Sequence, residues 1–260
     1  MAGNEGSLAS APEPARVPFG CPPEADMIPP DTHLEIGSLL FEGVDQIDLT
    51  GPFEVLSRIP NATYRVYGKT AETVRDVRGL RLTPDAAIED APQLDVLHVP
   101  GGFGQEDLME DEAVLAWLRR QAGGARSVFS VCTGALLCGA AGLLRGRRAT
   151  THWASFDLLP YFGAIPVDQR VVVDGTWVFA AGVTAGIDGA LRLAAELRGE
   201  DAAKAIQLYM AYAPEPPFDS GTPERAPPAI LEQARAAVAA ITERRTATAR
   251  RVAARLGVQP

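Results

Sequence analysis

Residues 129–142 read FSVCTGALLCGAAG, an apolar run that stops at Cys132 and a Gly- and Ala-rich segment that follows it at once. An apolar run predicts a strand over 125–131, and the Gly- and Ala-rich segment after it predicts a helix over 132–144. Cys132 would then lie in a sharp turn between the strand and the helix. A residue in such a turn lies at the carboxyl edge of a parallel sheet, where open α/β folds bind ligands. The helix N-terminus is expected to lower the pKa of the Cys132 thiol and make it a nucleophile. A buried, inert cysteine is the alternative.

Outward from this stretch, strands and helices alternate. Apolar or alternating runs predict strands, and two turn signals, Arg78-Gly79 and Asp174-Gly175, predict hairpins. The predicted strands are 34–41, 63–70, 95–102 and 125–131, the hairpins are 74–84 and 170–181, and the further helices are 51–59, 110–122, 185–199, 200–213 and 229–256. This order indicates an α/β fold with a mainly parallel central sheet and helices on both faces.

The domain organisation follows from composition. Seven of the first 30 residues are proline, and small or polar residues fill most of the remainder. Such a segment buries too little apolar surface to offset its ordering entropy, so residues 1–32 are predicted to be a disordered tail. Residues 33–260 are predicted to form a single domain that ends in a long helix.

Composition also excludes several classes of function. The chain carries 33 acidic and 24 basic residues, a net charge of -9, which argues against nucleic acid or an anionic membrane as partner. Its three cysteines cannot form a closed disulfide framework, and its three histidines show no zinc-binding spacing, so no metal site is expected. No apolar run approaches a membrane span and no signal peptide is evident, so a cytoplasmic location is expected.

Two further predicted strand ends carry polar or flexible residues. In QIDLTGPFEV (46–55), Asp48 follows the first strand by a short loop. It is either a turn or cap residue or, if partly desolvated beside Cys132, a general acid and base. In HVPGGFG (98–104), the amides of Gly101 and Gly102 are candidates for an oxyanion pocket.

Three other residues near the predicted edge have structural interpretations. His152 could pair with Cys132, but a hydrogen-bonded structural histidine is favoured. Cys138, among Leu and Ala inside the predicted helix, is expected to pack in the core. Val183, at the Gly-rich junction 182–191, is expected to form part of the wall of the pocket around Cys132.

Together these segments resemble the ThiJ/PfpI superfamily, over about residues 34–256. The stretches that carry the resemblance are DLTGP, VPGG, SVCTGALLCGAAGLLRGRRATTHWA, TAGID and YAPEPPF, and within the superfamily they are most similar to the branch whose members hydrate isocyanides. The resemblance implies a flavodoxin-like sandwich, of the class I glutamine amidotransferase-like type, with a cysteine nucleophile elbow. It also implies Cys132 as nucleophile, Asp48 as catalytic acid/base, Thr133 beside the nucleophile with its amide in the oxyanion pocket, no cofactor and a homodimer.

The activity implied by the resemblance is addition of water to an isocyanide, giving an N-substituted formamide through a Cys132 thioimidate. A glyoxalase- or deglycase-like enzyme and a non-enzymatic sensor related to AraC-type regulators are the alternatives. Thr133 and Asp48 count against the former, because such relatives often have His and Glu there. Two departures from the hydratase pattern are Ala180-Ala181-Gly182, where three glycines are expected, and Val183 in place of isoleucine.

The last predicted helix is rich in arginine. We expect these arginines to form a solvated face, while an apolar stripe packs on the domain or on a partner subunit. The arginines are Arg244, Arg245, Arg250, Arg251 and Arg255, and the apolar residues are Ile230, Leu231, Ala234, Val238 and Ile241.

Overall fold

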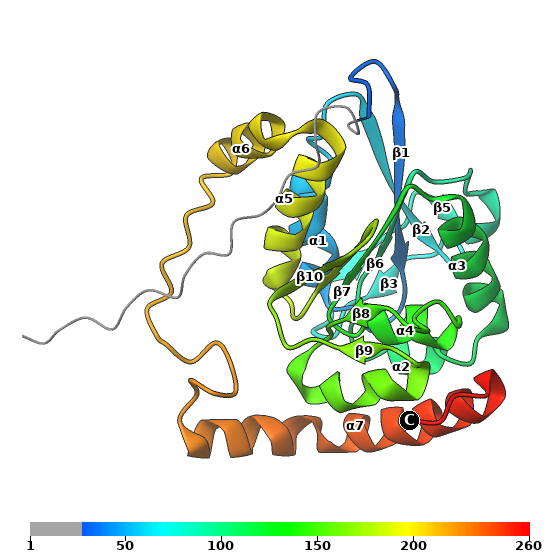
Figure 1. Ribbon diagram of the computed structural model, residues 1–260, viewed down its shortest axis with the longest axis vertical. Coiled ribbons are helices and arrows are strands. Elements are labelled where there is room, and N and C mark those ends of the chain that lie inside the picture. Colours follow the sequence, from blue (N-terminus) through cyan, green and yellow to red (C-terminus); the bar gives the residue numbers. More distant parts are fainter. Residues whose placement is uncertain (1–27) are drawn as a thin grey trace, which may run out of the picture.

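A seven-stranded sheet organises the computed structural model, which describes residues 28–260 (Figure 1). The strands are β1 (Leu34–Leu40), β2 (Ala62–Gly68), β5 (Ala86–Ala87), β6 (Val96–Val99), β7 (Ser127–Val131), β10 (Val171–Asp174) and β11 (Trp177–Ala180). They lie in the order β10-β11-β7-β6-β1-β2-β5, and every neighbouring pair is parallel except β10 with β11. The predicted, mainly parallel sheet is confirmed.

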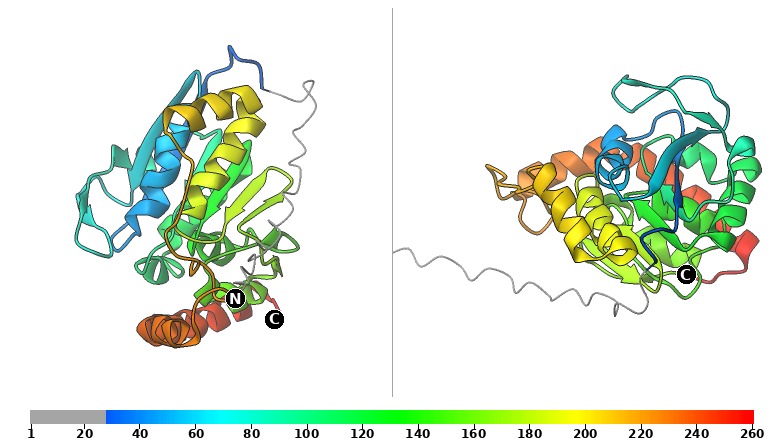
Figure 2. Two further views of the ribbon diagram at one scale, coloured as in Figure 1. Left: turned by 90° about the vertical axis from the view of Figure 1, so that its left-hand side faces the viewer. Right: turned by 90° about the horizontal axis from the view of Figure 1, so that it is seen from above.

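Helices cover both faces of this sheet. The helices are α1 (Gln46–Leu56), α2 (Gln105–Leu108), α3 (Glu112–Gly124), α4 (Gly134–Ala140), α5 (Ala185–Arg198), α6 (Glu200–Tyr209) and α7 (Pro228–Leu256), with the 3-10 helices η2 (Ile88–Asp90) and η3 (Trp153–Phe162). Helices α1, α5 and α6 lie on one side and α3 and α4 on the other, as Figures 1 and 2 show. The remaining strands form two small ribbons, β3 (Val74–Arg75) with β4 (Arg81–Leu82) and β8 (Arg148–Ala149) with β9 (Ile165–Pro166).

Alternation along the strands builds two apolar cores. On β6, Val96 packs toward the α1–α5 side, whereas Leu97 and Val99 pack toward α3 and α4. On β7, Phe129 and Val128 divide between the two cores in the same way. Both faces of these strands are therefore buried, which explains why they read as continuous apolar runs rather than as alternating ones.

Helix α1 differs most from its predicted extent. It begins at Gln46 rather than at Gly51, because the Asp45 carboxylate caps it by accepting from the N–H of Ile47 at 3.2 Å. Pro52 therefore lies inside the helix and not in its first turn, and Asp48 falls within the first turn. The two predicted hairpins form β3–β4 and β10–β11, with Gly79 and Gly175 at positive φ.

The chain's first described residues lie within the segment predicted as a disordered tail. The Arg198 guanidinium donates to the backbone carbonyls of Ile28, Pro29 and Thr32, so the ordered chain begins before residue 33. The prediction for residues 1–27 lies outside the described residues. Across residues 28–260, no helix combines the length and apolar character that a bilayer crossing requires.

Helix α4 lies unusually close to the end of β6, which is possible because residue 134 is glycine. A Cβ built on Gly134 would lie 2.0 Å from the carbonyl oxygen of Val99, which is backbone and cannot move aside. This close approach fixes the helix that follows Cys132 against the neighbouring strand end.

We predict that Gly134→Ala lowers the free energy of unfolding by about 1–3 kcal/mol, the usual cost of overpacking. Gly123→Ala in α3 is the matched control, because its Cβ would meet nothing within 4 Å and helical alanine is favoured over glycine. Urea unfolding of both variants measures the difference. Equal stability of the two variants would contradict the tight contact.

Candidate active site

Four parallel strands end at one edge of the sheet, and the candidate residues follow those ends. Asp48 lies beyond β1, Gly101 and Gly102 beyond β6, and Cys132 with Thr133 beyond β7. Val183 follows β11. Helix α7 runs past this edge, below the sheet in Figure 1. The structure gathers Asp48, Gly101, Gly102 and Thr133 around Cys132, whereas Val183 lines an adjacent cavity.

Cys132 occupies a strained elbow. Its φ of 56° lies in the left-handed region, which non-glycine residues adopt at an energetic cost and which is common at functional sites. Its N–H donates to the Ala180 carbonyl at 2.9 Å, and its own carbonyl accepts from the Thr151 hydroxyl at 2.8 Å. Both backbone groups are therefore tied down, and the residue is only 6% exposed.

Asp48 is a fully buried carboxyl in contact with this cysteine. Its Oδ2 accepts from the Gly101 N–H at 3.0 Å, and its carboxylate accepts from the Cys132 thiol. Burial, with a contribution from the nearby charge of Asp45, raises the pKa of Asp48 to about 8. Within the described residues, Oδ1 makes no hydrogen bond of ordinary geometry, so this oxygen can carry the proton. Asp48 is thus a carboxylic acid at neutral pH.

The pKa of Cys132 differs from the prediction. Burial, together with the charge of ionised Asp48, raises the pKa of the thiol well above its ordinary value. The Thr133 N–H and the positive charge of Arg245 act in the opposite direction, but they do not outweigh burial. The expected lowering by the helix N-terminus is therefore wrong for the free protein, because a seven-residue helix cannot compensate for the loss of water.

The amides of Gly101 and Gly102, predicted to form an oxyanion pocket, already have acceptors within the protein. The Gly101 N–H is taken by Asp48, and the Gly102 N–H donates to the Thr133 hydroxyl at 3.1 Å. Glycine at position 101 has another role: a Cβ there would lie 2.5 Å from the Thr133 nitrogen and 2.9 Å from Asp48 Oδ2. The missing side chain lets the acid, the loop and the elbow approach one another.

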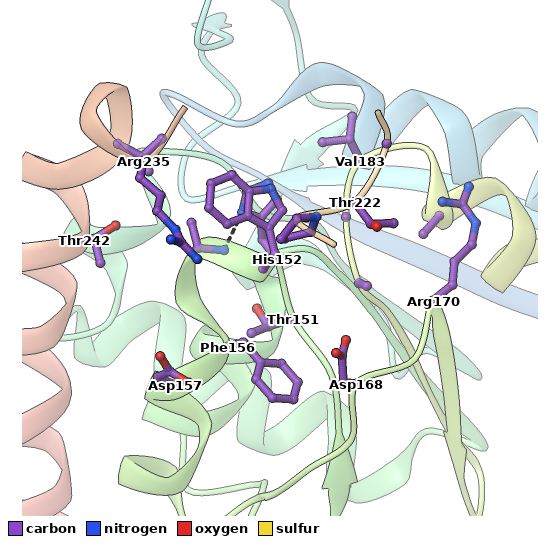
Figure 3. A pocket seen from close by; sticks show the side chains of 18 of the residues that line it. Thr151, His152, Phe156, Asp157, Asp168, Arg170, Val183, Thr222, Arg235 and Thr242 are labelled. Carbon is purple, nitrogen blue, oxygen red and sulfur yellow. Dashed lines mark hydrogen bonds between the residues drawn. The ribbon is translucent and has the colours of Figure 1, made fainter. Parts of the chain in front are cut away.

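A cavity of about 860 Å³ lies beside the elbow (Figure 3). Val183 and the strand end before α5 form one side, α7 with Arg235 and Thr242 forms another, and His152 lies between them. Thr151, which also lines the cavity, binds the Cys132 carbonyl and so links the two. The cavity is large enough for a small organic molecule.

His152 does not pair with Cys132 in the manner of a cysteine–histidine dyad. Its Nδ1 accepts from the Ala154 N–H at 3.3 Å at the start of η3. Burial and the nearby charge of Arg245 lower its pKa to about 4, so the ring is neutral at neutral pH. Cys138 is fully buried in the core.

Arg245 is the residue that sequence reasoning placed incorrectly. It is 3% exposed, and its guanidinium donates to the Gly102 carbonyl at 2.7 Å rather than facing solvent. The sequence does contain a pattern that indicates this burial. The helical spacing of Arg245, Thr248, Ala249 and Val252 puts all four on one face of α7, and this face is buried. Within residues 28–260, no group of three or more His, Cys, Asp or Glu could hold a metal ion.

Comparison with known proteins identifies the family. The DJ-1/PfpI family model matches residues 36–196, and the chain belongs to this family. The chain is 52% identical to the isonitrile hydratase of Pseudomonas putida over 226 residues, covering 87% of this chain and 99% of that protein. It is 29% identical to a deglycase of Thermococcus kodakarensis, over 53% of this chain and 83% of the deglycase.

A solved structure agrees with this assignment. The crystal structure of a ThiJ/PfpI family protein from Pseudomonas syringae superposes with a TM-score of 0.82 and 36% identity, covering 90% of this chain and 97% of that one. The predicted superfamily and flavodoxin-like fold are confirmed.

The pKa of Asp48 makes stability depend on pH. The unfolded carboxyl titrates near its ordinary 3.8 and the folded one near 8, so the folded state binds more protons between these values. Stability is therefore lost as pH rises through that window. We predict that Asp48→Asn is more stable than the wild type at pH 8 by at least about 1.4 kcal/mol, the equivalent of one pKa unit, and that the difference shrinks toward pH 4.

Urea unfolding between pH 4 and 8 measures this difference. The matched control is Asp201→Asn, because Asp201 is an exposed carboxyl on α6. A pH-independent difference for Asp48→Asn, equal to that of the control, would show that Asp48 is ionised in the folded protein at neutral pH.

Proposed function

We propose that this chain hydrates isonitriles to N-substituted formamides. The observation that carries the proposal is the buried pair of Cys132, at a strained elbow, and Asp48, a carboxyl that keeps its proton near neutral pH. The similarity to the Pseudomonas putida isonitrile hydratase, which spans nearly all of both chains, supports the choice of substrate.

In the first step, Cys132 and Asp48 act on the same carbon. The terminal carbon of an isonitrile accepts a nucleophile and also acquires a hydrogen. The reactive form of the pair holds one proton: the Cys132 thiol passes its proton to the Asp48 carboxylate beside it, which leaves a thiolate and a protonated acid. The thiolate forms the carbon–sulfur bond, and protonated Asp48 delivers its proton to that carbon, which gives a thioimidate and an Asp48 carboxylate. Low solvent exposure favours this step, because little water competes for either the thiolate or the proton.

In the second step, the Asp48 carboxylate takes a proton from water as the water oxygen attacks the thioimidate carbon. Asp48 passes this proton to the nitrogen, the new hydroxyl group returns its proton to Asp48 as the carbon–sulfur bond breaks, and an N-substituted formamide leaves. One water is consumed, and Cys132 and Asp48 return to their starting protonation. Burial, which raises the pKa of Asp48 to about 8, suits it to both the acid and the base role near neutral pH.

The departures from the hydratase pattern lie around the cavity rather than at the reacting pair. Ala180 contributes a backbone carbonyl to Cys132, while Ala181 and Val183 line the cavity. We assign this cavity to the substituent of the isonitrile, with Val183 in its wall. Thr133 cannot act as a proton-transfer histidine would, since its hydroxyl is committed to Gly102.

We also propose a homodimer. Several large apolar side chains on α6, the following loop and the start of α7 are exposed, which is typical of a surface that associates. They are Leu208, Tyr209, Phe218 and Ile230.

The hydratase proposal predicts formamide production from alkyl and aryl isonitriles. Cys132→Ala should reduce the rate to background, and Asp48→Asn should reduce kcat at least about 100-fold, because a general acid–base contributes about that much or more. Cys138→Ala is the matched control and should remain active, since Cys138 lies in the core. Nuclear magnetic resonance of the formamide proton measures turnover.

Two outcomes would contradict the proposal. One is the absence of turnover by folded wild-type protein on both small and bulky isonitriles. The other is full activity of Cys132→Ala. Consumption of methylglyoxal that depends on Cys132, without isonitrile turnover, would instead favour the deglycase-like alternative.

A further inference from the structure

Arg245 stands apart from the other arginines of α7. Arg244 pairs with Asp107, Arg251 pairs with Glu110, and all three neighbours Arg244, Arg250 and Arg251 are exposed. Arg245 differs because its side chain is only 3% exposed. It also lies close to the elbow in space, although more than 100 residues separate it from Cys132 in sequence. A fully buried guanidinium is rare unless it is paired, because losing its hydration is costly.

The partners of Arg245 are neutral. Its guanidinium donates to the Gly102 carbonyl at 2.7 Å, to Gln105 Oε1 at 3.1 Å and to Ser155 Oγ at 3.4 Å. The carboxylate whose charge acts on Arg245, Glu106, accepts instead from the Thr248 hydroxyl at 2.6 Å, and Arg245 makes no ion pair within the described chain. The positive charge is thus held in place without being directly neutralised, and its field reaches the elbow.

The Gly102 carbonyl connects Arg245 to both reacting groups. This carbonyl also accepts from the Thr133 hydroxyl at 3.3 Å, and the Gly102 N–H donates back to that hydroxyl. The Thr133 N–H in turn donates to the Cys132 sulfur, and the neighbouring Gly101 N–H donates to Asp48. Arg245 therefore anchors the loop whose amides orient the acid and border the thiol.

We propose that Arg245 is a positioning residue for the elbow: it fixes the Gly101–Gly102 loop and supplies the positive charge that stabilises the Cys132 thiolate. The proposal rests on the proposed function only in taking that thiolate as the nucleophile, and it makes no use of the identity of the substrate. It gives α7 a role in the chemistry rather than in packing alone.

The other charges around the elbow define the direction of the effect. Asp48 opposes ionisation of Cys132, whereas Arg245 favours it. Asp45 acts on Asp48, whose pKa it raises. Around Arg245 itself lie Glu106 from α2, Arg244 from α7 and the neutral His152. Among these groups, Arg245 supplies the positive charge that lowers the pKa of the Cys132 thiol. Removing this charge should therefore raise that pKa.

The test is the pH dependence of Cys132 alkylation by iodoacetamide, measured by mass spectrometry of the peptide that contains Cys132. This readout is separate from Cys21 and Cys138, and it needs no isonitrile. We expect Arg245→Met to move the pH midpoint of alkylation up by about one unit, a roughly tenfold slower reaction below the midpoint. Arg245→Lys keeps the charge but cannot make the three hydrogen bonds of the guanidinium, so it should shift the midpoint less than Arg245→Met does. Arg244→Met, at an exposed ion pair, should leave it unchanged.

Folded Arg245→Met with the wild-type midpoint would overturn the proposal, as would an equal shift in Arg244→Met. If Arg245→Met fails to fold, Arg245→Gln, which keeps hydrogen-bond donors but removes the charge, decides: an upward shift supports the proposal and an unchanged midpoint overturns it. A shifted alkylation midpoint in a protein that turns over no isonitrile would leave this role of Arg245 standing while refuting the proposed function.

Discussion

The site depends on one constraint: a carboxyl and a thiol are buried together, and the low-dielectric surroundings penalise the charge of either. Each anion raises the cost of the other, so Cys132 and Asp48 cannot both ionise cheaply. In the proposed reaction, the pair passes one proton from Asp48 to the substrate rather than losing it to water. This is a suitable arrangement for adding a nucleophile and a proton to one carbon.

The fold supplies the positions for this pair. Parallel strands β1, β6, β7 and β11 end at one edge, so residues more than 80 positions apart in sequence meet there. Glycine at positions 101 and 134 allows the approach, because a Cβ at either would collide with backbone. Helix α7 passes the same edge and brings Arg245 to the loop between acid and thiol. The strain at Cys132, whose backbone is held on both sides, is offset by the surrounding packing.

Much of this arrangement could be predicted from local patterns. The strand that stops at Cys132 and the Gly-rich strand ends indicated both the sheet and its functional edge, and the hairpins followed from Asp174-Gly175 and Arg78-Gly79. The start of α1 was missed because Pro52 suggested a first turn, although Asp45 caps the helix seven residues earlier.

The remaining errors concern long-range effects. The helix N-terminus correctly suggested a stabilised anion, but burial outweighs it, and burial depends on the whole fold. The amides of Gly101 and Gly102 looked available because their acceptors, Asp48 and Thr133, come from distant segments. Arg245 resembled its exposed neighbours for the same reason: its partners lie on α2, η3 and the β6 loop.

The central claim is that Cys132 forms a covalent bond to the substrate carbon. Rapid acid quenching of the wild-type protein during turnover of an isonitrile, followed by peptide mass spectrometry, tests it directly. The account predicts a mass increase equal to one whole isonitrile on the peptide that contains Cys132, since both the isonitrile carbon and the transferred proton are retained. Turnover with no such adduct at Cys132, or with an adduct at another residue, would contradict the account.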